Sequence, residues 1–458
     1  MQLKTVLSTV LAFILFAMFA LPASAEVTLD DLLKRVEALE QENTALKGEV
    51  MALKEKQTAQ TQQISEVQAK ATSAVASATA APTAAPSGNF LKTKMDIDLY
   101  GFLSLAATYS DSAAATASGT NSSVAATNAP RETIGINQSS FNATAQDTRL
   151  GLNLKAPDLD DGGKLSGKFE IDFAGSTNGG VYLPRLRLAY AQLDYPKWGA
   201  TAGQTWDFFA PLNPNTLNAG LLYRGGNLGT RRPQAYLTNR WGNMLGGKLT
   251  TKVGILDSDD PFQENSGAPV LGAYSSFETK VLGKPTTFGV GGIYGTNSTS
   301  LLGTKGTNNN TIYATTVGVT MKFADWLSFQ SEGFTGAKLD DFFGGSATGI
   351  TDTTTAELSI SKAVRVMGGF VELTYNPTKK IETNYGIGYD GADGKQTIPN
   401  LADRQAIWKS NRTYYTNLKY NLSKFLLVGV EYQYFATDYF DGVKGDDNRV
   451  QSMLIYKF

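Results

Sequence analysis

The chain has 458 residues, of which 18% are charged and 10% aromatic, and it contains neither Cys nor His. The absence of both residue types excludes a disulfide scaffold, a Cys/His zinc site and a Ser–His–Asp triad. Lys+Arg total 41 against Asp+Glu 42, so there is no basic surplus for general nucleic-acid binding. Low charge together with 46 Gly and 20 Tyr suits a membrane barrel whose strands are apolar at alternate positions.

Residues 1–25 read as an export signal. Lys4 precedes an apolar run over 6–21, and Ala23 and Ala25 supply the small-x-small pattern at which a signal peptidase cleaves. A transmembrane anchor is the alternative, but the cleavage pattern and the abrupt polar change at Glu26 favour export. The mature chain is therefore expected to begin at Glu26.

Residues 26–70 carry a heptad pattern. Apolar residues at position a are Leu29, Val36, Val50 and Ile64, and those at position d are Leu32, Leu39, Leu46, Leu53 and Val67. More than three sustained heptads indicate an α-helical coiled coil, and one helix cannot bury such a seam alone, so a homo-oligomer is expected. The alternative is an amphipathic helix folded against its own domain. Residues 71–94, rich in Ala, Thr, Ser and Pro, are typical of a linker.

Residues 95–458 alternate apolar and polar side chains with a period of two, which predicts strands. We count sixteen such runs, beginning near residues 97, 147, 164, 185, 199, 232, 247, 274, 286, 312, 326, 357, 380, 411, 424 and 448. Short connections alternate with long polar ones. This parity is typical of an outer-membrane barrel with its turns on the periplasmic side, so the fold class is all-β, a sixteen-stranded antiparallel transmembrane β-barrel. A soluble sandwich would explain the strands but not the loop parity or the export signal.

Sixteen strands enclose an aqueous channel, so function is sought on the inward polar faces. Arg185 and Arg187 lie on the face opposite Leu186 and Leu188, and Arg231 leaves the third loop. Guanidinium groups in a narrow pore replace an anion's hydration and bind carboxylate bidentately. The alternative is that they pair with the inward acids Glu170 and Asp172 or lie at the rim. The predicted constriction and anion-binding residues are Arg149, Arg185, Arg187, Arg224, Arg232 and Arg240.

The third loop, 205–231, has too much apolar content for a free extracellular loop. It is expected to fold into the pore, to pack Trp206, Phe208 and Phe209 on the inner wall, and to narrow the channel, with Asp207 facing the arginines. The first loop, 110–146, is expected to be a mobile surface excursion. No metal site is expected, because the acidic stretch 158–162 lacks calcium-loop spacing and reads as a turn.

The chain ends on an alternating strand with a terminal Phe458, as in sequences resembling Gram-negative outer-membrane proteins, where that strand is read by the barrel-assembly machinery. Several motifs occur in order along 95–458, and together they resemble the DcaP-like porins. They are Leu99-Tyr100-Gly101-Phe102, Gly167-Lys168-Phe169-Glu170-Ile171-Asp172-Phe173, Arg185-Leu186-Arg187, Gly203-Gln204-Thr205-Trp206, Arg232-Pro233-Gln234, Gly429-Val430-Glu431-Tyr432 and Tyr456-Lys457-Phe458.

The resemblance implies a homotrimer of sixteen-stranded barrels, each with its own pore, that takes up small anions such as dicarboxylates. The family's pore arginines carry over to Arg185, Arg187 and Arg232. The family has another Arg after the Pro-Gln pair, whereas Ala235-Tyr236 stand there in this chain. Val at a and Leu at d of the coil favour a dimer instead. We favour the trimer, because a porin interface buries more surface than a short coil.

These patterns predict an anion-selective diffusion porin of the Gram-negative outer membrane that passes small carboxylate-type solutes, with its coiled coil in the periplasm. It is expected to contact outer-membrane lipid and to need no cofactor. The alternatives are a general or phosphate-type porin, or a tether whose coil contacts peptidoglycan while the pore is secondary. A barrel enzyme is disfavoured, because its usual catalytic His is absent.

Overall fold

The computed structural model describes residues 95–112, 115–116, 126–130, 132, 139–175, 177–178, 181–257, 268–298, 309–345, 351–352, 359–360, 364–392 and 408–458. The predicted signal peptide (1–25), coiled coil (26–70) and linker (71–94) lie outside the described residues. No helix in the described part of the chain is long and apolar enough to cross a membrane.

The described elements are almost all strands. In chain order they are β1 (Asp96–Ser110), β2 (Ala115–Thr116), β3 (Ala126–Asn128), β4 (Ser140–Thr144), β5 (Arg149–Lys155), β6 (Lys164–Asp172), β7 (Thr177–Asn178), β8 (Val181–Tyr182), β9 (Arg185–Asp194), β10 (Trp198–Trp206), β11 (Arg231–Met244), β12 (Gly247–Leu256), β13 (Val270–Val281), β14 (Lys284–Ser298), β15 (Asn309–Ala324), β16 (Leu327–Ala337), the 3-10 helix η3 (Asp340–Phe342), β17 (Thr351–Asp352), β18 (Ser359–Ile360), β19 (Arg365–Tyr375), β20 (Ile381–Ala392), β21 (Trp408–Asn421), β22 (Leu426–Tyr439) and β23 (Lys444–Lys457).

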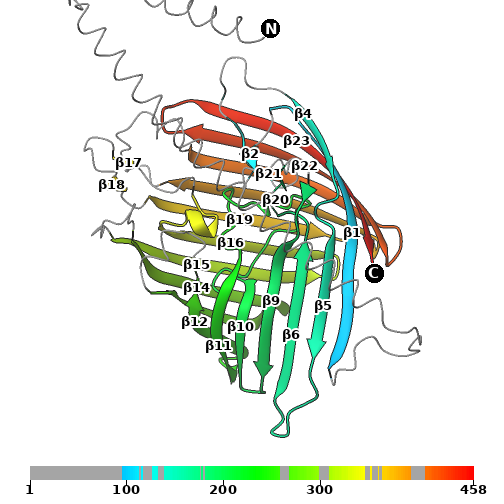
Figure 1. The fold of residues 1–458 in the computed structure, drawn as a ribbon, viewed down its shortest axis with the longest axis vertical. Coiled ribbons are helices and arrows are strands. Elements are labelled where there is room, and N and C mark those ends of the chain that lie inside the picture. Colours follow the sequence, from blue (N-terminus) through cyan, green and yellow to red (C-terminus); the bar gives the residue numbers. More distant parts are fainter. Residues whose placement is uncertain are drawn as a thin grey trace, which may run out of the picture. The chain divides into compact units, whose positions relative to one another are not determined.

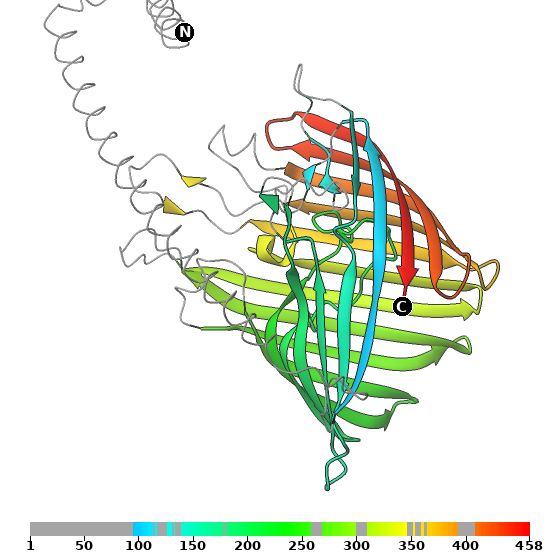
Figure 2. The same cartoon turned by 45° about the vertical axis from the view of Figure 1, so that its right-hand side comes forward.

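One antiparallel sheet closes into a barrel (Figures 1 and 2). It joins 17 of the described strands, but β4 and β5 pair with successive stretches of β1 on the same side and so fill one position between them. The other side of β1 pairs with β23, from Phe102 opposite Lys457 to Ser110 opposite Arg449, and this closes the ring. The predicted sixteen-stranded antiparallel barrel is confirmed.

Two strand starts differ from the sequence-based expectation by more than four residues. The twelfth strand was expected near residue 357, but β19 begins at Arg365, and the alternating stretch before it forms a separate two-stranded ladder, β17–β18. The second strand begins earlier than expected, because β4 pairs with β1 before a short break leads into β5. Alternation predicts a strand but not which partner it finds, which accounts for the first error.

The first loop is not simply a surface excursion. Thr127 and Ala129 are buried, and the Asn411 side-chain amide donates to the Thr127 carbonyl at 2.7 Å. The Ala129 N–H donates to Thr437 Oγ1 at 3.0 Å, and its carbonyl accepts from the Tyr439 hydroxyl. That expectation is therefore wrong for 127–130, which is bound to the inward faces of β21 and β22.

The two faces of the wall differ as the alternation predicts. On β1, Leu99, Leu103 and Leu105 are exposed on the outside, whereas Ser104 and Thr108 are buried on the inside. The apolar core of the protein consequently lies within the barrel, between the wall and two segments that enter it. Its buried members are Phe208, Phe209, Ala210, Leu228, Leu256, Val270, Ile293, Ile312, Ala314, Phe334, Leu339, Phe342, Val364 and Val366.

The outward apolar face gives a first prediction. Leu103 lies at the middle of β1 and is 54% exposed, so Leu103→Arg places a cation on this face. If the face contacts lipid, the free energy of unfolding falls by about 2–4 kcal/mol. Urea unfolding of the protein in lipid vesicles measures this, with Leu245→Arg in the β11–β12 turn as the control. Equal unfolding midpoints for the two variants would contradict a lipid-facing wall.

Candidate functional site

The segment 207–230 between β10 and β11, here called the third-loop segment, lies inside the ring of strands (Figures 1 and 2). Its two ends are joined: the Asp207 N–H donates to the Thr230 carbonyl at 2.8 Å, and the Thr230 N–H donates to Asp207 Oδ2 at 2.8 Å. Burial raises the pKa of Asp207 to about 6, against the opposing effect of Arg232. The ionised carboxylate therefore depends on that arginine.

Arg232 anchors the place where the two ends of the third-loop segment meet. Its side chain is fully buried, its Nε donates to Asp207 Oδ1 at 2.8 Å, and its Nη1 donates to Asp341 Oδ2 at 3.2 Å. Its other contacts are the carbonyls of Asp257 and Asp341 and, 3.9 Å from the guanidinium carbon, the centre of the Phe342 ring. Arg232 was predicted as an anion-binding residue, but the structure places it behind the third-loop segment, where it holds the segment to the wall.

The apolar residues at the start of the segment pack beside this anchor. The Phe208 ring lies 4.8 Å from the Tyr236 ring, and the Phe209 ring lies 5.5 Å from the Phe342 ring. Wall glycines admit the loop backbone: a Cβ on Gly291 would lie 2.0 Å from the Phe209 carbonyl oxygen. The segment is thus packed against the inner wall.

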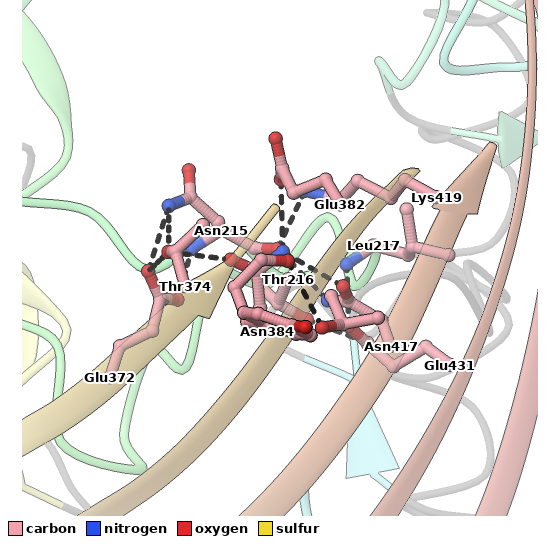
Figure 3. A network of polar contacts seen from close by, with 12 residues as sticks. Asn215, Thr216, Leu217, Glu372, Thr374, Glu382, Asn384, Asn417, Lys419 and Glu431 are labelled. Atoms are coloured by element: carbon pink, nitrogen blue, oxygen red, sulfur yellow. Dashed lines mark hydrogen bonds and ion pairs between the residues drawn. The ribbon is translucent and has the colours of Figure 1, made fainter. Parts of the chain in front are cut away.

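Three inward-facing glutamates bind the middle of the third-loop segment. They lie on β16, β19 and β22, in the part of the ring opposite β9 that is called the far wall below. Glu332 on β16 accepts from the Leu212 N–H at 3.5 Å, and Glu372 on β19 accepts from the Asn215 N–H at 2.6 Å and its side-chain amide at 2.7 Å. Glu431 on β22 accepts from the N–H groups of Leu217 and Asn218 and from the Thr216 hydroxyl (Figure 3). These carboxylates therefore accept hydrogen bonds from backbone N–H groups of the third-loop segment.

Neighbouring amides extend the same network (Figure 3). The Asn417 amide donates to the Asn215 carbonyl at 2.9 Å and to Glu431 Oε2 at 2.9 Å, and Lys419 Nζ donates to the Asn215 carbonyl at 2.8 Å. Asn384 joins Asn417 through a 2.9 Å hydrogen bond. Side chains from β20, β21 and β22 thus hold a single turn of the third-loop segment.

Arg449 on β23 supports the next turn and was not predicted. It is buried and donates to Gln433 Oε1 at 2.6 Å and to Gln451 Oε1 at 2.9 Å. Gln451 in turn donates to the Leu217 carbonyl, and Gln433 accepts from the Asn218 amide. The sequence contains a pattern that could have identified Arg449. It has the same inward parity as Gln451 in β23 and alternates with the exposed Val450.

A second segment also enters the barrel and was not predicted. Residues 338–345, which include η3, accept hydrogen bonds from the third-loop segment: the Arg224 N–H donates to the Phe343 carbonyl and the Gly229 N–H to the Phe342 carbonyl, both at 2.8 Å. The rings of Tyr223 and Phe343 stack with centroids 4.4 Å apart. Two loop segments in contact with each other therefore lie inside the barrel.

A cavity of about 620 Å³ lies between these loops and the near wall, formed by β1, β5, β9, β10, β11 and β23. Four arginines line it: Arg149 on β5, Arg185 and Arg187 on β9, and Arg231 at the start of β11. Its other side chains are mainly apolar or amide. They include Phe102, Trp206, Asn213, Thr216, Leu217, Asn218, Leu221, Tyr223, Phe343, Met453 and Ile455.

The predicted opposing acids lie directly beneath the arginines. Asp172 Oδ2 is 2.7 Å from Nη2 of Arg185 and 2.7 Å from Nη1 of Arg187. Glu170 Oε1 is 2.7 Å from Nε of Arg187 and 3.5 Å from Nε of Arg149. The pairing anticipated as an alternative to free arginines therefore occurs at Arg185 and Arg187, and over a longer distance at Arg149.

A β-bulge produces this grouping. Glu170 pairs with Leu188 and Ile171 pairs with Leu186, so Arg187 is the extra residue on β9. Leu188 is consequently buried on the same side as Glu170, whereas the alternation placed it opposite the arginines. Bulges redirect side chains in this way, and here the bulge brings Arg187 within reach of both acids.

Of the remaining predicted residues, Trp206 lines this cavity and Arg224, Arg240 and Phe458 do not. Arg224 is absent from the described lining of this cavity, and its carbonyl accepts from Asn411 at 2.8 Å. Arg240 lines a separate cavity of about 220 Å³ and pairs with Asp194 at 2.6 Å. Trp206 lies at the cavity under Arg231, whose guanidinium carbon is 5.0 Å from the indole. Phe458 closes the seam, exchanging backbone hydrogen bonds with Gly101.

Removing the Arg232 guanidinium should destabilise the protein, because two carboxylates then lose their buried counter-charge. For Arg232→Gln we expect the free energy of unfolding to fall by about 3–5 kcal/mol. Denaturant unfolding of the folded barrel measures it. Arg412→Gln, which removes a 48% exposed arginine paired with Asp438, should change stability by at most about 1 kcal/mol.

Glu431→Ala should loosen the third-loop segment while leaving the wall intact. The loss of charge-assisted hydrogen bonds to buried N–H groups costs about 2 kcal/mol. That is roughly a thirtyfold increase in local opening, measured as faster amide hydrogen exchange at Leu217 and Asn218. Glu278→Ala, which removes an exposed glutamate of β13, is the control. Unchanged exchange at both amides would show that Glu431 does not hold the loop.

No family model and no curated protein matches the chain. Among solved structures, the outer membrane channel DcaP of Acinetobacter baumannii matches with a TM-score of 0.65 and 22% identity, covering 81% of this chain and 100% of that chain. The anion-selective porin from Comamonas acidovorans matches with a TM-score of 0.50 and 12% identity, covering 80% and 100%. The resemblance to DcaP predicted from the sequence is thus confirmed at the level of the fold.

Proposed function

We propose that the protein is a diffusion porin of the outer membrane that prefers anions and passes small carboxylate-type solutes. The observation that carries this proposal is the cavity inside the barrel, which four arginines line from one wall. Among the described lining residues Asp147 is the one carboxylate. Likeness in fold to an outer membrane channel and to an anion-selective porin supports the same function.

The charge balance around the cavity favours an anion. Arg149, Arg185, Arg187 and Arg231 face three nearby carboxylates, those of Asp147, Glu170 and Asp172. Counted as formal charges, the four arginines and three carboxylates sum to one positive charge. In a cavity partly screened from water, that surplus acts more strongly than at a surface, and N–H donors replace part of an anion's hydration shell.

Two of the arginines are better placed than the others to bind a solute. Arg185 and Arg187 donate to Asp172 and Glu170. By contrast, Arg149 is held less closely, with its Nε 3.5 Å from Glu170 Oε1, and Arg231 stacks on Trp206 and has no ion pair among the described residues. We therefore assign anion binding chiefly to Arg149 and Arg231, and assign Arg185 and Arg187 to shaping the field and positioning the acids.

The cellular setting belongs to the same proposal. The apolar outer face would contact outer-membrane lipid, with the short turns in the periplasm and the terminal strand at Phe458 recognised by the barrel-assembly machinery. The protein would act as a homo-oligomer, a trimer by resemblance. Residues 26–70 would form the periplasmic coil that meets other copies or peptidoglycan.

Zero-current potentials in planar bilayers under a salt gradient test the function. The wild type should prefer chloride to sodium. The double variant Arg149→Gln/Arg231→Gln should lower the chloride-to-sodium permeability ratio at least about fivefold, because the formal charge around the cavity changes from one positive to one negative. Arg412→Gln, outside the described cavity lining, should leave it unchanged. A wild-type channel without anion preference would leave a general porin, and no conductance at all would reject the pore.

A further inference from the structure

We infer that the cavity selects monocarboxylates with an apolar or aromatic body over dicarboxylates of the same length. This inference rests on the proposed function and names the substrate class of that site. Its basis is that the cavity has one basic wall, a facing wall with apolar side chains and no cation among its described residues, and formal charges that sum to one positive charge.

The arginines all come from one side of the barrel. They are carried by β5, β9 and β11, which lie close together around the ring. The facing side is the third-loop segment, whose residues 212–218 are bound to β16, β19 and β22 on the far wall. Around the closed sheet β9 is the fourth position and β19 the twelfth, so the two walls are opposite each other. A solute in the cavity therefore meets guanidinium groups on one side only.

The facing side offers little to a second carboxylate. The third-loop segment presents Leu217, Leu221 and Tyr223 to the cavity, and Phe343 stacks on Tyr223. Asn213, Thr216 and Asn218 also line this side, but the Thr216 hydroxyl donates to Glu431 and the Asn218 amide donates to Gln433. The described lining has no lysine or arginine apart from the four on the basic wall. The acids of the far wall are bound to loop N–H groups, so that side is not a second basic pole. A second carboxylate would lose its hydration there without gaining a cationic partner among the described residues.

The charge surplus points the same way. Four guanidinium groups and the carboxylates of Asp147, Glu170 and Asp172 sum to one positive charge. A monoanion neutralises this surplus, whereas a dianion leaves one negative charge in a partly desolvated site. The apolar body of a monocarboxylate would also cover Leu221 and the stacked aromatic pair, and burial of that surface is favourable.

Hexanoate and adipate provide the direct test, because they share a six-carbon chain and differ by one carboxylate. Each replaces chloride on one side of a bilayer that contains the full-length protein, at about pH 8 where both acids are ionised. We expect hexanoate to be at least about threefold more permeant than adipate in the wild type. Equal or greater adipate permeability in a channel that still prefers chloride to sodium would overturn the inference and leave the proposed function standing.

Two variants separate the apolar wall from the charge. Leu221→Asn removes the apolar side chain at a φ of 47°, a conformation that Asn tolerates, and should abolish the threefold preference. Leu245→Asn, at a φ of 51° in an exposed turn, is the matched control and should retain it. Asp147→Asn raises the surplus to two and should increase adipate permeability at least about threefold relative to hexanoate. A preference that survives both Leu221→Asn and Asp147→Asn would also overturn the inference. A wild-type channel that does not prefer chloride to sodium would reject the proposed function along with it.

Discussion

A chain segment that crosses the inside of a barrel needs hydrogen-bond partners for its own backbone, because the wall strands have already used theirs. In this protein inward glutamates meet that need. Glu372 and Glu431 accept from the N–H groups of Asn215, Leu217 and Asn218, and Gln451 donates to the Leu217 carbonyl. The path of the third-loop segment, and with it the shape of the cavity, depends on these contacts.

The same contacts divide the charge within the barrel. Carboxylates on β16, β19 and β22 are buried against loop N–H groups, so they are screened from the cavity by the loop itself. The arginines of the near wall are not covered in this way, and all four line the cavity. The near wall of the cavity is therefore positive because the third-loop segment covers the glutamates of the far wall.

The fold could be predicted from the sequence because a two-residue period states which side of a wall each residue faces, and the strand count follows from the number of such periods. The segments that lie inside the barrel were harder to predict from the sequence. Aromatic and Pro residues indicated that 205–231 turns inward, but nothing in 338–345 marked it as a second inward segment. The alternation also does not predict which inward-facing residues contact one another. That depends on register, and the β-bulge at Arg187 altered it locally.

Arg187 and Arg231 illustrate why residue type alone does not assign a role. Both line the cavity, but Arg187 is bound to Glu170 and Asp172, whereas the described contact of Arg231 is the face of Trp206. Removing Arg187 would leave two acids facing the cavity, so its loss would alter selectivity through their charge as well as its own. Removing Arg231 breaks no ion pair among the described residues, and a change in selectivity there reports directly on anion binding.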